Sequence, residues 1–128
     1  MARVGRGAAS VVVVRYEVTD ADTAARVGSG DVAVLATPRL IAWLEAATVR
    51  AAAQFVGPGQ TTVGTAVRIE HRRATKVGGA VEVSAEPPSA PAGRVLTFRV
   101  RAVDDSGQLV GVGEIDRAIV DREQFLAR

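Results

Sequence analysis

The chain has 128 residues, 48% of them hydrophobic and 23% charged, which fits one folded domain and not a disordered segment. It contains no cysteine, so disulfides, a thiolate nucleophile and cysteine-built metal sites are excluded. The single histidine, His71, excludes a multi-histidine metal site within one chain, and a net charge of +2 is only weak evidence for nucleic-acid binding.

The N-terminal third begins with residues 1–9, which are small, glycine-rich and basic. We expect them to be a flexible end, so the predicted domain spans residues 10–128. The β-branched run at 10–18 predicts a strand, and the polar, glycine-containing residues 19–31 predict a loop or lid. The uncharged runs are too short for a membrane span and no signal-peptide cleavage pattern follows the basic end, so we expect a cytoplasmic protein.

A long helix is predicted over residues 38–55. Thr37 and Pro38 form a helix-start signal, in which threonine caps free N–H groups and proline suits the first turn. Apolar residues recur at helical spacing on a wide face, and the glycine-proline-glycine sequence at 57–59 ends the pattern.

Four further strands are predicted after the helix, at residues 61–74, 80–86, 94–103 and 108–120, followed by a short polar end with Phe125 and Leu126 as an apolar anchor. One strand, one long helix and four hairpin-connected strands predict an α+β fold, in which the helix covers one face of a curved antiparallel sheet. The uncovered face and edges of such a sheet favour a homodimer.

Glu45 is the first candidate for chemistry. The helical period places it within the apolar face of the predicted helix and away from Arg39 and Arg50. A carboxylate there is costly unless it is paired or has a function. It is either an edge residue or hydrogen-bond partner, or a functional group.

His71 is the second candidate. It shares one face of the predicted strand at 61–74 with an alternating series, while Gly64 and Arg68 fall on the other face. The series on the first face is Val63, Thr65, Val67 and Ile69. A lone histidine there is more often a satisfied core residue, but a facing carboxylate could orient it as a general base.

Thr37 is the third candidate, and its simplest role is that of a helix cap. A hydroxyl at a helix start also lies beside free N–H groups that can stabilise an oxyanion. Thr37 and Glu45 are eight positions apart, or about 12 Å along a straight helix, so they cannot contact each other directly.

These residues resemble the fluoroacetyl-CoA thioesterase family, whose members are small hot-dog-fold enzymes. The resemblance covers most of the chain from about Val32 onward. The segments that carry it are Ala36-Thr37, Trp43 to Ala51, Gly64 to His71, Asp116 to Val120 and Glu123 to Phe125.

The resemblance implies a hot-dog fold and an acyl-CoA thioesterase that needs no cofactor beyond the coenzyme A of its substrate. Thr37, Glu45 and His71 match the catalytic set of the family in order and spacing. On this basis His71 is the general base, Glu45 orients it or attacks, and Thr37 positions water or attacks.

By the same resemblance, Gly64 and Arg117 line the acyl end of the pocket. A glycine in a strand also suits close approach of a ligand to the backbone, or a bulge. Arg117 has a simpler interpretation, which is pairing with Asp116 or Glu114 at the surface.

Two departures from the family pattern bear on function. A fluoroacetate specialist carries phenylalanines in the loop before the threonine, whereas residues 19–36 hold no aromatic residue, so the acyl group stays open. Pro38 has no N–H, so other donors at the helix start, or the N–H of Gly64, would have to hold an oxyanion.

The basic cluster comprises Arg68, Arg72, Arg73 and Lys76. Its members could meet the phosphates of coenzyme A, although a solvated strand face explains them more simply.

Three alternatives to a thioesterase remain. A non-catalytic acyl-CoA binding or sensing module on the same fold would bind without turnover. A hydratase on this fold would want a histidine-aspartate helix motif that the chain does not show. A nucleic-acid binder fits poorly with five aromatic residues and no basic helix.

Overall fold

The computed structural model describes residues 3–6, 11–88 and 93–128, with side chains from residue 11 onward. In chain order its elements are β1 (Arg3–Arg6), β2 (Val12–Glu17), η2 (Asp20–Asp22), α1 (Ala24–Val27), α2 (Thr37–Ala52), η3 (Ala53–Phe55), β3 (Gln60–His71), β4 (Ala80–Glu86), β5 (Val95–Asp104), β6 (Leu109–Asp121) and α3 (Arg122–Leu126).

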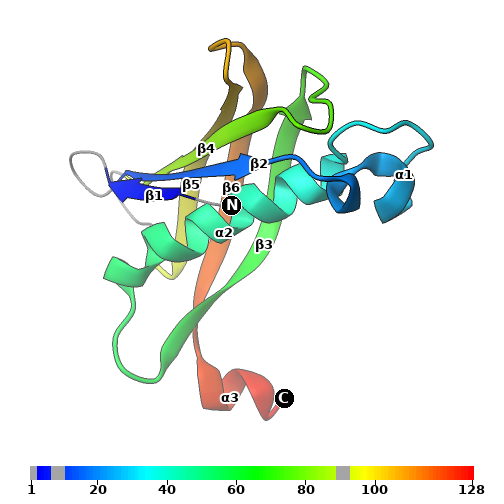
Figure 1. Cartoon of the computed structure of the whole chain (residues 1–128). Helices are drawn as coiled ribbons and strands as arrows, with labels where there is room; N and C mark the ends of the chain where they lie inside the picture. The colour runs from blue at the N-terminus through cyan, green and yellow to red at the C-terminus, as the bar shows by residue number, and fades with distance from the viewer. Residues whose placement is uncertain (1–2, 7–10, 89–92) are drawn as a thin grey trace.

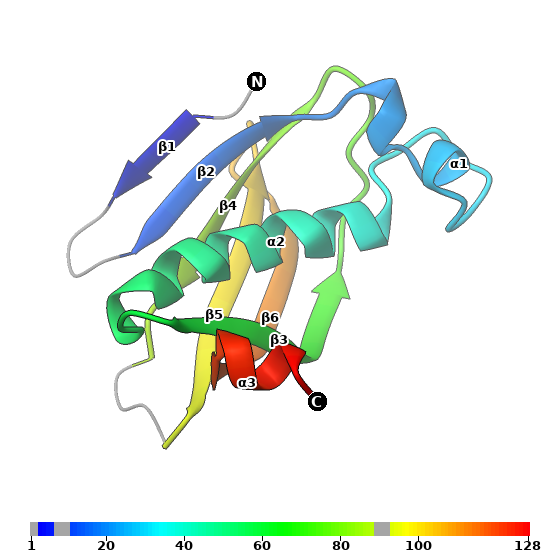
Figure 2. The ribbon, with the colours of Figure 1, turned by 90° about the horizontal axis from the view of Figure 1, so that it is seen from below.

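The described strands form one antiparallel sheet in the order β1-β2-β4-β5-β6-β3. The long helix α2 lies across one face of this curved sheet (Figure 1). Strands β1 and β3 are its two edges, and β3 runs beside α3 at the edge away from β1 (Figure 2). The predicted α+β arrangement of a helix against a curved sheet is confirmed.

The core lies between α2 and the sheet. Leu40 and Leu44 of α2 are fully buried, as are Leu96 and Phe98 of β5 and Ile115 of β6. Burying side chains of this size contributes about 1.5–3 kcal/mol each. The apolar face read from the sequence is therefore the face that fixes α2 against the sheet.

The start of α2 differs from the prediction. Ala36 is the N-cap and makes no side-chain capping bond, while Thr37 is the first helical residue and Pro38 follows it. Thr37 therefore does not cap the helix, and its hydroxyl group is free for another partner. Proline is tolerated there because the first-turn N–H groups have no partner within the helix.

Strand β3 contains a bulge that changes which side chains share a face. Gly64 pairs with Arg117 and Ala66 pairs with Asp116, so Thr65 is an extra residue in the ladder. A bulge shifts the alternation by one residue. The prediction that Gly64 and His71 lie on opposite faces is wrong, because both face α2: a Cβ at Gly64 would touch Glu45, and His71 contacts Thr37.

The segment before α2 holds two short helices, η2 and α1, where the sequence predicted a loop or lid. Backbone hydrogen bonds from Ala24 to Val34 and from Ala25 to Val32 tie α1 to the chain that leads into α2. The segment is thus an ordered flap over the N-terminal end of α2. It lies at the end of the helix away from α3 (Figure 1).

The chain ends also carry more structure than expected. Residues 3–6 form β1 and pair with β2, so the prediction of a flexible end is wrong for these four residues, while 1–2 and 7–9 lie outside the described residues. The polar C-terminal stretch forms α3, where Asp121 accepts a capping hydrogen bond from the Gln124 N–H.

Candidate active site

The hydroxyl of Thr37 meets the ring of His71 at the start of α2. The distance between Thr37 Oγ1 and His71 Nδ1 is 2.7 Å. Thr37 comes from the first turn of α2 and His71 from the last position of β3, thirty-four residues later. The fold therefore joins two of the three residues singled out from the sequence.

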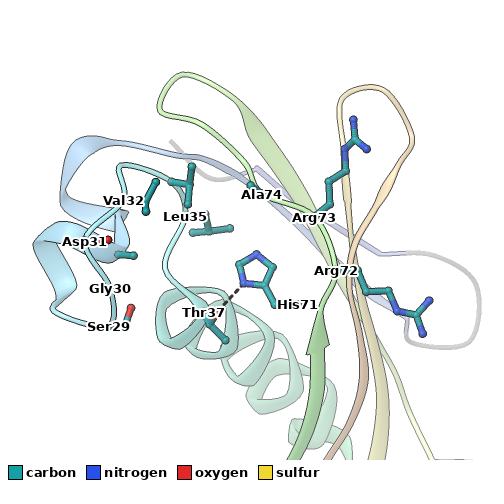
Figure 3. Close-up of a pocket in the computed structure, with 12 residues that line it drawn as sticks. Ser29, Gly30, Asp31, Val32, Leu35, Thr37, His71, Arg72, Arg73 and Ala74 are labelled. Atoms are coloured by element: carbon teal, nitrogen blue, oxygen red, sulfur yellow. Dashed lines mark hydrogen bonds between the residues drawn. The ribbon is translucent and has the colours of Figure 1, made fainter.

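A cavity of about 350 Å³ opens onto this pair (Figure 3). Its walls come from the flap before α2 and from the chain that follows β3. The lining residues are Ala24, Ser29, Gly30, Asp31, Val32, Val34, Leu35, Thr37, His71, Arg72, Arg73 and Ala74. The cavity thus combines an apolar flap with a hydroxyl-imidazole pair.

The two ring nitrogens of His71 have different surroundings. Nδ1 faces Thr37, whereas Nε2 is buried and has no hydrogen-bond partner among the described residues. Burial lowers the pKa of His71 below its usual value, and the backbone of Arg73 opposes this in part. Burial therefore favours the neutral imidazole, which is the form that a general base needs.

Backbone donors are present at the same helix end. The N–H of Leu40 bonds to the carbonyl of Ala36 at 3.0 Å and begins the helical ladder. The N–H groups of Thr37 and Arg39 precede that ladder, and Pro38 has none. Pro38 therefore removes one backbone donor from the first turn of α2, and the N–H groups of Thr37 and Arg39 remain as donors there.

Glu45 lies in a second cluster farther along α2. Its Oε2 is 3.6 Å from Nη1 of Arg117, and its side chain is 38% exposed. It does not contact His71, and neither Glu45 nor Arg117 lines the cavity at Thr37. One chain therefore presents two clusters, about two helical turns apart.

Arg117 is buried and not at the surface. It is 7% exposed, and it donates from Nε to the hydroxyl of Thr62 at 2.8 Å and from Nη2 to the Thr62 carbonyl at 3.1 Å. Its expected surface partners instead bind Arg68, which donates to both Glu114 and Asp116. The surface interpretation of Arg117 is wrong.

Gly64 gives Glu45 its place against β3. A Cβ at this position would lie 2.7 Å from Glu45 Oε2 and 3.5 Å from Arg117 Nη1. Real Cβ atoms do not approach an oxygen that closely, so a side chain would displace the carboxylate. The group that lies against this glycine is thus Glu45, the alternative of a bulge is seen next to it, and the approach of a ligand stays a prediction.

Sequence reasoning missed Thr62 and the link between Asp22 and Arg39. Thr62 fixes the guanidinium of Arg117, and Asp22 pairs with Arg39 at 3.3 Å while its carbonyl accepts from Ala36 N–H. The first contact fixes Arg117, and the second ties the segment before α2 to the helix start that carries Thr37. No sequence pattern marks either contact, because each joins elements whose approach only the folded chain reveals.

The arginines of the basic cluster are paired with acidic residues. Arg68 binds Glu114 and Asp116, Arg72 binds Glu70, and Arg73 binds Asp104. Figure 3 shows the side chains of Arg72 and Arg73 extending away from the His71 ring. These ion pairs favour the interpretation of the basic cluster as a solvated strand face over its interpretation as a site for the phosphates of coenzyme A.

Within the described ranges, no group of three or more histidine or acidic side chains is placed to hold a metal ion. Among the helices of these ranges, none combines the length and the apolar character that a membrane span requires.

A family model described as fluoroacetyl-CoA-specific thioesterase, FlK, matches residues 18–123. The chain belongs to this family. A curated relative, the fluoroacetyl-CoA thioesterase of Streptantibioticus cattleyicolor, is 39% identical over 95 residues, which cover 74% of this chain and 67% of the relative. The FlK family is a family of thioester hydrolases.

Solved structures agree with this membership. A structure of the fluoroacetyl-CoA thioesterase FlK has a TM-score of 0.83 and 30% identity, covering 96% of this chain and 94% of FlK. A thioesterase superfamily member from Thermus thermophilus has a TM-score of 0.84 and 25% identity, covering 98% of this chain and 90% of that protein. The FlK-family chain described here has the hot-dog fold that the sequence predicted.

Proposed function

We propose that the protein is an acyl-CoA thioesterase that hydrolyses small acyl thioesters. The observation that carries the proposal is the 2.7 Å contact between Thr37 Oγ1 and His71 Nδ1 at the wall of the cavity. Relatives add support, since FlK has been solved with fluoroacetate and CoA.

In the proposed reaction, the neutral ring of His71 accepts a proton at Nδ1 from the attacking group. With the ring proton on Nε2, the hydroxyl of Thr37 donates to Nδ1, which makes Thr37 either the attacking oxygen or the group that holds the attacking water. The new C–O bond forms at the thioester carbonyl, the C–S bond breaks, and the imidazolium returns its proton to the leaving thiolate. If Thr37 is the attacking oxygen, a water activated by His71 then attacks the acyl-threonine ester, which releases the acid and restores the Thr37 hydroxyl.

The backbone N–H groups of Thr37 and Arg39 are the proposed donors to the carbonyl oxygen as it becomes an oxyanion. They lie at the positive end of the α2 dipole and beside the hydroxyl that positions the attack. An acyl group attached to Thr37 would be detected as a mass increase after rapid quenching. Its absence under turnover would assign the attack to water.

Glu45 is proposed as a catalytic residue, and Gly64 and Arg117 are proposed as substrate-binding residues beside it. Arg117 is held rigidly by Thr62, and Glu45 lies against Gly64 with its carboxylate partly open to solvent. A buried, fixed guanidinium is suited to polarising a carbonyl or binding a carboxylate product. In this arrangement Glu45 acts on substrate or water and not through His71.

A homodimer along β3 is proposed as the working form. β3 is a long edge strand, with Val67 41% exposed on it and Val49 51% exposed on the neighbouring α2. An unpaired edge of this kind is normally covered. A second copy there would also cover Gly64 and Glu45 and exclude water from this cluster.

The proposal leaves the acyl group open and does not assign fluoroacetyl-CoA as the substrate. One FlK structure with fluoroacetate and CoA carries a phenylalanine replaced by alanine, and other FlK structures carry a replaced threonine six positions farther on, with fluoroacetate or acetyl-CoA bound. If that threonine corresponds to Thr37, the phenylalanine corresponds to Asp31, which lines the cavity.

The deciding experiment is release of free thiol from a panel of short acyl-CoAs that includes acetyl-CoA and fluoroacetyl-CoA. We expect turnover by the wild type and a loss of about a hundredfold or more in His71→Ala, because the base is removed. Binding of acyl-CoA to a stable protein with no turnover would overturn the enzyme and leave an acyl-CoA sensor.

A further inference from the structure

Asp31 is the feature of the cavity that the proposed reaction does not use. It lies on the flap between Gly30 and Val32, and the three residues together form part of the cavity wall (Figure 3). Its side chain is exposed, and none of the described residues forms an ion pair or side-chain hydrogen bond with it. Asp31 is therefore an exposed acid of the cavity wall that has no side-chain partner among the described residues.

The backbone on both sides of Asp31 is tied to α1. The N–H of Ser29 bonds to the carbonyl of Ala24 at 3.1 Å, and the N–H of Ala25 bonds to the carbonyl of Val32 at 3.2 Å. Asp31 thus lies between two residues that are tied to α1. Its position at the cavity rim is set by the backbone.

The other charged residues at the cavity do not neutralise the charge of Asp31. Arg72 and Arg73 also line the cavity, but they pair with Glu70 and Asp104, and their side chains extend away from the His71 ring (Figure 3). The neighbouring acids of the flap are already paired, Asp20 with Arg26 and Asp22 with Arg39. Among the lining residues, Asp31 carries the one charge without a partner.

Resting on the proposed thioesterase function, we propose that Asp31 selects the acyl group by charge. An ionised carboxylate accepts hydrogen bonds and donates none, so it favours an acyl chain that ends in an ammonium or another strong donor. It disfavours an acyl chain that ends in a carboxylate, because two like charges would meet at the rim. The substrate class assigned is the thioester of a short amino-substituted acid.

The test uses two thioesters of equal size, β-alanyl-CoA and butyryl-CoA, which differ by an ammonium in place of a methyl group. The measured quantity is the ratio of their kcat/KM values in the wild type, Asp31→Asn, Asp31→Glu and the control Glu82→Gln. Glu82 is an exposed acid on β4, so its variant changes the net charge equally and leaves the cavity intact. Comparing ratios between variants cancels the intrinsic reactivity of each thioester.

We expect the ratio to fall about fivefold in Asp31→Asn, to stay near the wild-type value in Asp31→Glu and Glu82→Gln, and to shrink as salt is raised. Melting temperatures should match across the set, because the side chain is exposed. An unchanged ratio in Asp31→Asn, with both thioesters hydrolysed, would overturn charge selection and leave the thioesterase intact.

Failure of the proposed function gives a different result. If neither thioester is hydrolysed, binding of the corresponding non-hydrolysable thioether analogues is measured by calorimetry for the same variants. A preference for the ammonium analogue that disappears only in Asp31→Asn would keep the selection by Asp31. Equal binding of both analogues to every variant would overturn it.

Discussion

At the scale of single residues, Glu45 and Gly64 depend on each other. The carboxylate occupies the space where a side chain on Gly64 would lie, 2.7 Å from the position of a Cβ. The glycine is thus a packing requirement of the acid opposite it. The pair forms one unit shared between α2 and β3.

Gly64→Ala is therefore expected to displace Glu45 and to lower kcat by about tenfold or more, if the carboxylate has to keep its place. Gly57→Ala is the matched control, since a Cβ there would meet Gln60 at an ordinary 3.6 Å. Steady-state kinetics and melting temperature check both variants. Equal activity in the two would contradict the role given to Glu45.

The neutral state of His71 predicts a pH dependence. Because burial lowers its pKa, the base stays neutral below the usual histidine range, and kcat/KM should hold constant down to about pH 6.5 and fall only at lower pH. The profile is measured from pH 5 to 8. A decline that begins well above pH 6.5 would contradict a buried neutral base.

The same shift has a stability consequence of definite sign. Below about pH 6.5 the unfolded chain binds a proton at His71 while the folded chain does not, so the free energy of unfolding falls with falling pH. Urea unfolding at pH 7.5 and 5.5 should show a larger loss in the wild type than in His71→Gln. Parallel losses would show that another group is responsible.

Substitution of Thr37 is expected to lower activity with little effect on stability. It makes no capping bond, so Thr37→Ala should cost less than about 1 kcal/mol of folding free energy. Activity should nevertheless fall about a hundredfold, because the hydroxyl on His71 is lost, and Thr37→Ser should retain most of it. Urea unfolding and thiol release together check this, and a variant that loses stability but keeps activity would identify Thr37 as a cap.

At the scale of elements, helix and strand periodicity located α2 and the four strands that follow it, because each buries one regular face. It could not locate η2 or α1, which are too short to show a periodic pattern. Periodicity also could not predict the order of the strands in the sheet, because it does not indicate which strands become neighbours.

The two errors at the candidate site have different origins. Gly64 was placed away from His71 because the prediction assumed a regular strand, whereas Arg117 was placed at the surface because Asp116 and Glu114 offered it acidic partners there. The bulge at Thr65 turns Gly64 toward α2, and Arg117 is buried beside it with Thr62 as its partner. A bulge has no reliable sequence mark, so the resemblance named these residues without giving their contacts.

At the scale of the whole molecule, the two edges of the sheet differ. One ends in the short strand β1, whereas the other is the long strand β3 with apolar side chains at its surface. The candidate groups Gly64 and His71 both belong to β3. The proposed dimer interface and two of the proposed site residues therefore share one strand.

Val67→Glu should weaken the proposed dimer, because a buried unpaired charge at the interface is costly. Val77→Glu is the control, since Val77 is also exposed but lies outside the strands. Sedimentation measures the oligomeric state, and thiol release measures the activity lost with it. A wild type that sediments as a monomer and is fully active would overturn the dimer.

The extra residue at Thr65 determines which side chains of β3 face α2 on either side of the bulge. Removing it would leave every candidate group in the sequence, yet one half of β3 would turn over relative to the other, and either Gly64 or His71 would leave the face of α2. A member of the family could therefore lose its site through one deletion that touches none of its functional residues. For these chains, the spacing of the motif carries as much information as the residues in it.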